Sequence, residues 1–288
     1  MERYTLAAIA SGLLMGLAGP LSRILNSGGM SAEEIAVMRF GIAALILGLM
    51  TARRRTELRV RIRDLWMFLG GGILGQFCFA FFYFRAVTLA PLAVVSTLSS
   101  TYPFFVLFFS CVFWKEKLTK TKAAALFLAL LGSALVSGAF KESGISIDGI
   151  MMAAISGVAY ALFCIFSRIA VGRGYSPKTV NFYTWVGAFL CALIVWPDLR
   201  PLSSAFAVWQ NIVACLLLGG VVGCGASYLF SWSLKVLPAG RAAILASSSP
   251  LVAMVSGAVL FDEQITIDRL LGVMILLLAI FLLNYKIK

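Results

Sequence analysis

The chain is built from ten long apolar runs joined by short polar segments. A helix rises ~1.5 Å per residue, so about 20 apolar residues cross the ~30 Å hydrocarbon core of a bilayer. We therefore expect an all-α integral membrane protein with ten transmembrane helices. The runs cover residues 5–25, 33–50, 65–87, 91–114, 121–139, 149–171, 177–197, 210–234, 239–261 and 266–285.

Composition excludes the two other broad classes. Hydrophobic residues make up 61% of the 288-residue chain and charged residues 12%, whereas soluble domains carry roughly 25% charged residues. A soluble enzyme and a disordered chain are both excluded. The six cysteines lie inside the apolar runs and the chain has no histidine, so we expect no metal site, no disulfide and no cofactor. The first run has no convincing cleavage site, and we treat it as a span.

Lysine and arginine lie mostly on one side of the predicted spans. With a cytoplasmic N-terminus, 17 of them are cytoplasmic. Because positive charge stays on the cytoplasmic side, we expect both termini there, in a multi-pass protein of the cell (inner or plasma) membrane. This placement accounts for the net charge of +12 without a nucleic-acid partner. Outer loops and outer helix ends hold five basic residues: Arg23, Arg85, Lys141, Arg200 and Arg269.

The sequence contains itself twice. A shift of 147 residues places Pro91 on Pro238 and Glu116 on Glu263, and near the start of each half a shift of 145 places Gly12 on Gly157. Five spans per half is an odd number, which predicts two inverted-topology five-helix repeats, residues 1–144 and 145–288, in one structural unit. Such repeats are typical of transporters with one central site. Duplication for structural support alone is the alternative.

A doubled motif carries a family resemblance over nearly the whole chain. The first copy of the motif is Leu98 to Pro103 followed by Glu116-Lys117-Leu118-Thr119. The second copy is Ser249-Pro250 followed by Glu263-Gln264-Ile265-Thr266. The chain resembles EamA-type members of the drug/metabolite transporter superfamily, and Arg39-Phe40 also fits. The resemblance implies ten helices, a cavity between the halves and movement of a small metabolite. The family often has Trp-Gly where this chain has Met15-Gly16, which leaves the cavity shape, and hence the substrate, open.

Polar and aromatic residues inside the spans are the candidates for lining that cavity. Gln76, Phe79 and Tyr83 have the spacing of one helix face. A single serine serves helix packing as readily as cavity lining. The full set of substrate-site candidates is Gln76, Phe79, Tyr83, Ser99, Tyr102, Tyr160, Phe163, Tyr228, Ser249 and Arg39.

Pro103 and Pro250 lie midway along their predicted spans. Each removes an N–H and frees the carbonyl four residues earlier, on Ser99 and Ala246. An opened helix at that depth is tolerated only against protein or a wet cavity. The two prolines are therefore candidate hinges, or positions where a freed carbonyl contacts the substrate, and a fixed kink that shapes packing is the alternative.

Every Asp and Glu lies near a span end or in a loop. Because intramembrane ionisable groups mark proton routes, we expect no proton antiport through a buried acid, and transport of a neutral or zwitterionic solute. Arg39 is the exception, roughly 9 Å beneath the outer end of its span. It either attracts a substrate carboxylate or pairs with Glu33 or Glu34 and extends outward.

These observations predict a secondary transporter, a facilitator or exchanger working by alternating access. We expect it to act as a monomer on a small organic metabolite, such as an amino acid or related amphipathic compound. An intramembrane enzyme would need paired acids, a catalytic cluster or metal ligands at membrane depth, and we expect no catalytic residues. A non-transporting receptor or scaffold is the other alternative.

Overall fold

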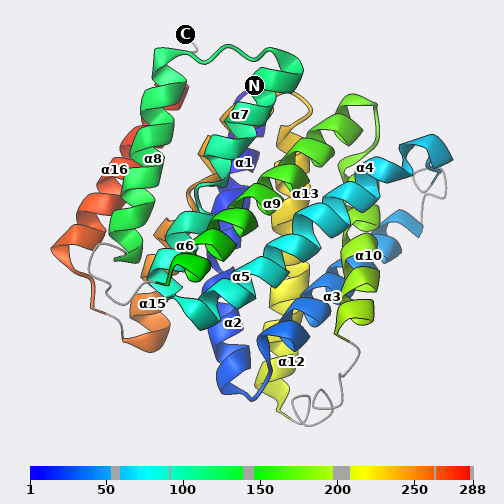
Figure 1. Ribbon diagram of the computed structural model, residues 1–288, viewed down its shortest axis with the longest axis horizontal. Coiled ribbons are helices and arrows are strands. Elements are labelled where there is room, and N and C mark those ends of the chain that lie inside the picture. The colour runs from blue at the N-terminus through cyan, green and yellow to red at the C-terminus, as the bar shows by residue number, and fades with distance from the viewer. Residues whose placement is uncertain (53–58, 91, 139–145, 197–207, 263, 286–288) are drawn as a thin grey trace.

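The computed structural model describes residues 1–288 except 53–58, 91, 139–145, 197–207, 263 and 286–288. Its described residues form helices and no strand, which confirms the all-α prediction. Within these described ranges, nine helical segments are long and apolar enough to cross a membrane, and a further 19-residue helix, α16 (Ile267–Tyr285), occupies the last predicted run. The start of α1 (Glu2–Gly16) and the end of α16 lie at the same end of the bundle (Figure 1). The predicted boundary between the repeats, at residues 144 and 145, lies within 139–145, outside the described residues.

The first half supplies five predicted spans, several of them divided into shorter helices. Its elements are α1 (Glu2–Gly16), α2 (Ala18–Ser27), α3 (Ala32–Ala52), η2 (Ile62–Asp64), α4 (Leu65–Leu69), η3 (Gly70–Phe77), α5 (Cys78–Leu89), α6 (Leu92–Ser99), α7 (Tyr102–Trp114) and α8 (Lys120–Ser137). The second half follows with α9 (Ile147–Gly172), α10 (Pro177–Val195), α12 (Trp209–Leu216), η5 (Leu217–Ala226), α13 (Ser227–Ser233), α14 (Ala239–Ala246), α15 (Ser249–Phe261) and α16.

The repeat extends to irregular backbone. The π-helices η3 and η5 begin at Gly70 and Leu217, 147 residues apart. Lys115 and Asp262, also 147 apart, end α7 and α15 and both have φ of 52°, in the left-handed region. Non-glycine residues adopt that region uncommonly, so its recurrence at matched positions is strong support for the duplication.

The spans that contain the two prolines are broken rather than kinked. Each consists of two helices, α6 with α7 and α14 with α15, and Pro103 and Pro250 lie in the first turn of the second helix. That position suits proline, because its missing N–H has no helical partner there. The first span is also divided, at Leu17, which the sequence interpretation did not anticipate.

Each half covers the break in the other. A Cβ on Gly12 of α1 would overlap the carbonyl oxygen of Ala246, and one on Gly157 of α9 would lie 3.2 Å from the carbonyl oxygen of Ser99. Ser248 Oγ also donates to the carbonyl of Ile9 at 2.9 Å. The glycines let a neighbouring helix approach the freed carbonyls and keep lipid away from them.

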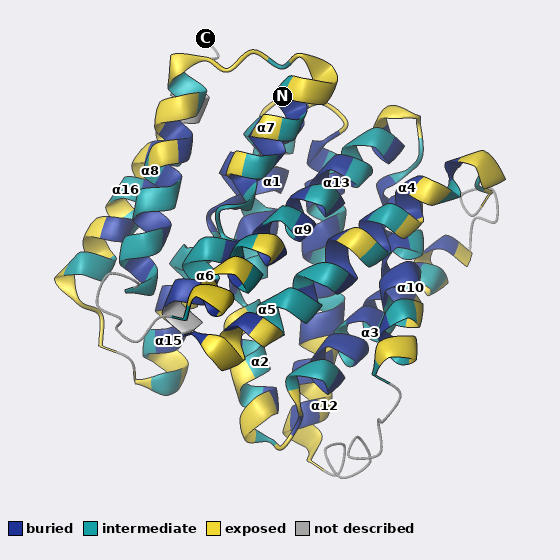
Figure 2. Ribbon diagram, viewed as in Figure 1, coloured by how far each residue is buried: buried dark blue, intermediate teal, exposed yellow. Residues whose placement is uncertain are grey.

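Burial follows this arrangement. Buried residues gather on the central helices, and exposed residues are frequent at the helix ends and on the outer helices (Figure 2). Large apolar residues such as Phe108 and Phe127 are among the exposed ones, as contact with lipid requires. Helices α8 and α16 lie side by side at one edge (Figure 1), where a Cβ on Gly132 or Gly272 would lie 2.8 Å from the other glycine's carbonyl oxygen.

We predict that Gly12→Ala lowers the apparent melting temperature of the detergent-purified protein by several degrees, because overpacking costs roughly 1–3 kcal/mol. Gly19→Ala is the matched control in the same span, since a Cβ there would meet nothing within 4 Å. Helix propensity alone favours alanine at both positions. Equal melting temperatures for the two variants would contradict the close contact.

Candidate functional site

Aromatic side chains from α5, α7 and α9 meet around Tyr160. Its ring centroid lies 4.7 Å from that of Tyr102, 5.2 Å from Phe79 and 5.6 Å from Phe163. Tyr83 joins through Phe79, at 5.6 Å. We name these five residues the aromatic cluster. They come from both halves, and the structure thus brings together five of the ten predicted site residues.

Arg39 points toward the middle of the bundle. Its Nη2 lies 3.7 Å from the sulfur of Met15, and its guanidinium carbon lies 5.6 Å from the ring centroid of Trp185. Tyr160 is near enough for its phenol, when ionised, to act electrostatically on Arg39. Arg39 therefore contacts the end of α1 and the middle of α10, within electrostatic range of the aromatic cluster.

The predicted pairing of Arg39 with Glu33 or Glu34 is wrong. Glu34 Oε2 accepts the backbone N–H of Ser31 at 2.8 Å, and Ser31 Oγ accepts the N–H of Glu34 at 3.2 Å. This capping box occupies Glu34 at the start of α3. Among the described residues, Arg39 forms no ion pair. The acidic residues in the described ranges lie at helix ends or in the connections between helices.

Two residues that hold this region together were missed. Trp185 Nε1 donates to Ser227 Oγ at 3.1 Å, and Asn181 Nδ2 donates to Ser231 Oγ at 2.9 Å. Both residues are on α10, one helical turn apart, and fasten it to α13. Tryptophan and asparagine inside an apolar run were the available signal.

The remaining candidates are dispersed. Gln76 is 2% exposed, and its Oε1 has no hydrogen-bond partner in the part of the chain that the structure describes. Ser99 Oγ lies 2.6 Å from Ser156 Oγ in a packing contact, and Ser249 is half-buried with its carbonyl oxygen against Gly16. Tyr228 is half-buried, outside the aromatic cluster. Pro103 and Pro250 are the second residues of α7 and α15, and their action as hinges stays a prediction.

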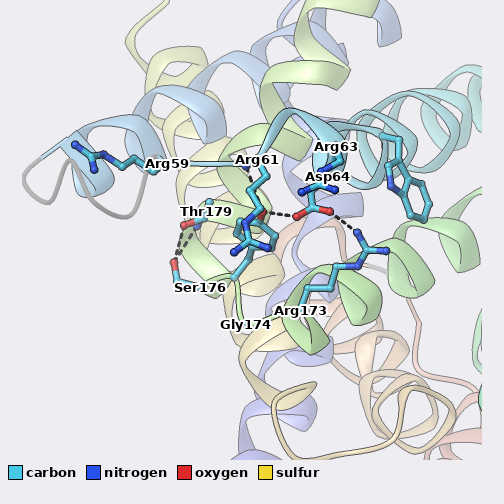
Figure 3. A pocket seen from close by; sticks show the side chains of 10 residues that line it. Arg59, Arg61, Arg63, Asp64, Arg173, Gly174, Ser176 and Thr179 are labelled. Carbon is cyan, nitrogen blue, oxygen red and sulfur yellow. Dashed lines mark hydrogen bonds and ion pairs between the residues drawn. The ribbon is translucent and has the colours of Figure 1, made fainter.

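A hollow of about 830 Å³ lies at the helix ends, not among the aromatic residues. Within it Asp64 pairs with Arg173 and accepts the Tyr175 hydroxyl at 2.6 Å (Figure 3). Desolvation and this hydrogen bond raise the pKa of Tyr175, which keeps its hydroxyl protonated as a donor. The contacts join the start of the third span to the connection between α9 and α10. The other residues lining the hollow are Arg59, Arg61, Arg63, Trp66, Gly174, Ser176 and Thr179.

A second hollow, of about 300 Å³, lies at the opposite end of the third span. It includes Glu33 and Arg85 beside the aromatic rings of Phe81, Phe84 and Trp196. Neither hollow contains a member of the aromatic cluster.

The duplicated helices can be compared with known proteins. The profile of the EamA-like transporter family matches residues 3–138 and again residues 147–285. The chain belongs to the EamA-like transporter family. The double match agrees with the two halves seen in the backbone, and it places this EamA-like protein among multi-pass membrane proteins.

Relatives of this EamA-like protein include an uncharacterized transporter of Archaeoglobus fulgidus, 25% identical over 89% of this chain and 90% of the relative. The pseudopaline exporter CntI of Pseudomonas aeruginosa is 26% identical over 59% of this chain and 58% of its own. One crystal structure matches with a TM-score of 0.81 over 99% of this chain and 97% of that one, at 19% identity, which shows the shared fold.

We predict that Asp64→Asn lowers the melting temperature of this EamA-like protein, because it weakens the contact with Arg173 and leaves that cation without its carboxylate. The pair is partly exposed, so a shift of a few degrees is expected. Arg63→Gln is the control, since Arg63 is exposed beside the same hollow. An Asp64→Asn protein as stable as Arg63→Gln would show that the contact contributes nothing.

Proposed function

We propose that this membrane transporter is a facilitator or exchanger that carries a small organic metabolite by alternating access. The observation that carries the proposal is the meeting of both halves at one mid-membrane cluster, where Tyr160 contacts Phe79 and Tyr102. In inverted-repeat transporters the substrate lies near the midplane at the repeat interface. The family match supports transport rather than catalysis.

The cluster suits an amphipathic solute such as an amino acid. Aromatic faces bind flat or apolar groups, and Arg39 adds a positive charge within electrostatic range of Tyr160. Among the described residues, carboxylates lie at helix ends or in the connections between helices, and the buried Glu34 caps the start of α3. An acid midway along a span, through which protons could be exchanged, therefore has no candidate there. We propose that the protein acts as a monomer and has no catalytic role.

The helix breaks are points at which the chain can bend during alternating access. The breaks before Pro103 and Pro250 interrupt the hydrogen-bond ladder near the centre of the bundle. Their segments contact the first helix of the opposite half. Rocking of one half against the other would bend the chain at these points while the glycine contacts persist.

The test begins with a thermal-stability screen of the purified protein against amino acids, quaternary amines, sugars, nucleosides and vitamins, because a bound ligand stabilises the folded state. Compounds that stabilise it are then followed by counterflow in proteoliposomes. We expect Tyr160→Ala to weaken binding about tenfold, since aromatic contacts contribute ~0.5–1.5 kcal/mol each. Phe108→Ala is the control, because Phe108 is 56% exposed on the lipid-facing side.

Counterflow by wild type and Phe108→Ala, with loss in Tyr160→Ala, would support the proposal. Binding without counterflow would favour the receptor or scaffold alternative. Counterflow at the wild-type rate in Tyr160→Ala would place the substrate elsewhere.

We propose further that both termini are cytoplasmic in the cell membrane, because the segments on their side hold most of the lysines and arginines. A fluorescent protein fused after Lys288 should fluoresce in cells, and alkaline phosphatase fused at the same point should be inactive. Fusions after Ser27, on the opposite side, should show the reverse. An active phosphatase after Lys288 would invert the orientation.

A further inference from the structure

We infer that Arg39 is the counter-charge for a carboxylate on the transported solute. The inference rests on the proposed function and narrows it to carboxylate-bearing compounds, either anions or zwitterions. Three observations support it: the position of the guanidinium within the bundle, its unfilled hydrogen-bond donors and the aromatic residues near it.

The guanidinium lies deep within the membrane-spanning part. Arg39 is the eighth residue of α3, roughly 10 Å along the helix from its start. Long cationic side chains near a helix end normally extend to the water interface. Here the head group instead contacts Met15 and Trp185, and Trp185 is near the middle of α10. The charge is therefore held inside the bundle.

The guanidinium is incompletely paired. It has five N–H donors, and among the described residues its one hydrogen-bond acceptor is the Met15 sulfur, a weak acceptor at 3.7 Å from Nη2. The Nε atom is buried without a partner in the described part of the chain, although Arg39 as a whole is partly exposed. Glu34, the acid nearest to Arg39 in the sequence, caps α3 instead. An arginine with a purely structural role would be expected to have protein acceptors, since an unpaired buried charge is strongly unfavourable.

The surroundings suit a carboxylate with an attached apolar group. Guanidinium binds carboxylate through two parallel N–H···O bonds, which few other ligands match. The Trp185 ring supports the guanidinium from one side and is itself fixed by its bond to Ser227. Tyr160, a member of the aromatic cluster, lies within electrostatic range of Arg39. A carboxylate at Arg39 would place the rest of the solute against Tyr160, whereas a quaternary amine would be repelled.

The test uses matched acids and amides. Aliphatic and aromatic carboxylates, among them L-phenylalanine and 3-phenylpropionate, are compared with their amides and with phenyltrimethylammonium for stabilisation of the full-length protein. We expect at least one acid to bind roughly 10- to 100-fold more tightly than its amide, as a lost charge-assisted hydrogen bond implies. This comparison needs no variant, so it stands even where a substitution prevents folding.

Variants assign the preference to Arg39. Arg39→Gln should abolish the difference between acid and amide, and Arg39→Lys should retain part of it, because it keeps the charge but loses the planar fork. Arg85→Gln is the control, an arginine stacked on Phe81 at 5.1 Å but exposed at a helix end. A structural role for Arg39 would lower stability without changing the ratio of acid to amide affinity.

The inference is overturned if amides or phenyltrimethylammonium bind as tightly as acids, if no carboxylate binds, or if Arg39→Gln keeps the acid preference. Counterflow measurements distinguish failure of this inference from failure of the proposed transport function. Carriage of a non-carboxylate, unchanged by Arg39→Gln, would leave transport standing and remove the role of Arg39. Arg39-dependent carboxylate binding without counterflow would leave the site standing and remove transport.

Discussion

Backbone polar groups at membrane depth must find partners within the protein, because lipid offers none. This chain nevertheless interrupts its helices at Leu17 and ahead of Pro103 and Pro250. The interruptions are possible because α1 and α9 each present a glycine to the broken helix of the opposite half. The halves thereby interlock, and the region where they meet holds the aromatic cluster. The helix breaks, the glycine contacts and the candidate site therefore depend on one another, because the contacts that cover the broken helices also bring the two halves together at the site.

The fold could be predicted from sequence because the lipid constraint leaves few alternatives. Apolar runs give the spans, and the repetition of Glu116 as Glu263 and of Pro103 as Pro250 gives the two halves. The π-helices were not predicted, since the expected spacing of Gln76, Phe79 and Tyr83 assumed regular α-turns. A turn closed by an i→i+5 bond holds one more residue, which shifts Gln76 out of register with the residues that follow it. The many glycines in η3 and η5 were the available signal.

The sequence indicated several residues of the candidate site, but not the residues that each of them contacts. Arg39 and Glu34 are close in sequence, which suggested an ion pair, yet Ser31-Ala-Glu-Glu34 is also a capping-box sequence and that local contact formed. Tyr160 was identified as a lining residue from its mid-span position, and its three ring contacts come from α5, α7 and α9 itself. Trp185 was missed because its importance comes from contacts with Arg39 and Ser227 on other helices, which the order of residues along α10 does not reveal.

The contact between Gly12 and Ala246 also has a consequence for how the protein is made. These residues are more than 200 positions apart in the chain, and ribosomes add roughly 5–20 residues per second. The first helix therefore waits in the bilayer for on the order of ten to fifty seconds before its partner is synthesised. During that interval its glycine face meets lipid, or whichever membrane chaperone occupies it. Exposing a face of small, uncharged residues to lipid costs little free energy during this interval, whereas exposing a charged contact surface at the same depth would be strongly unfavourable.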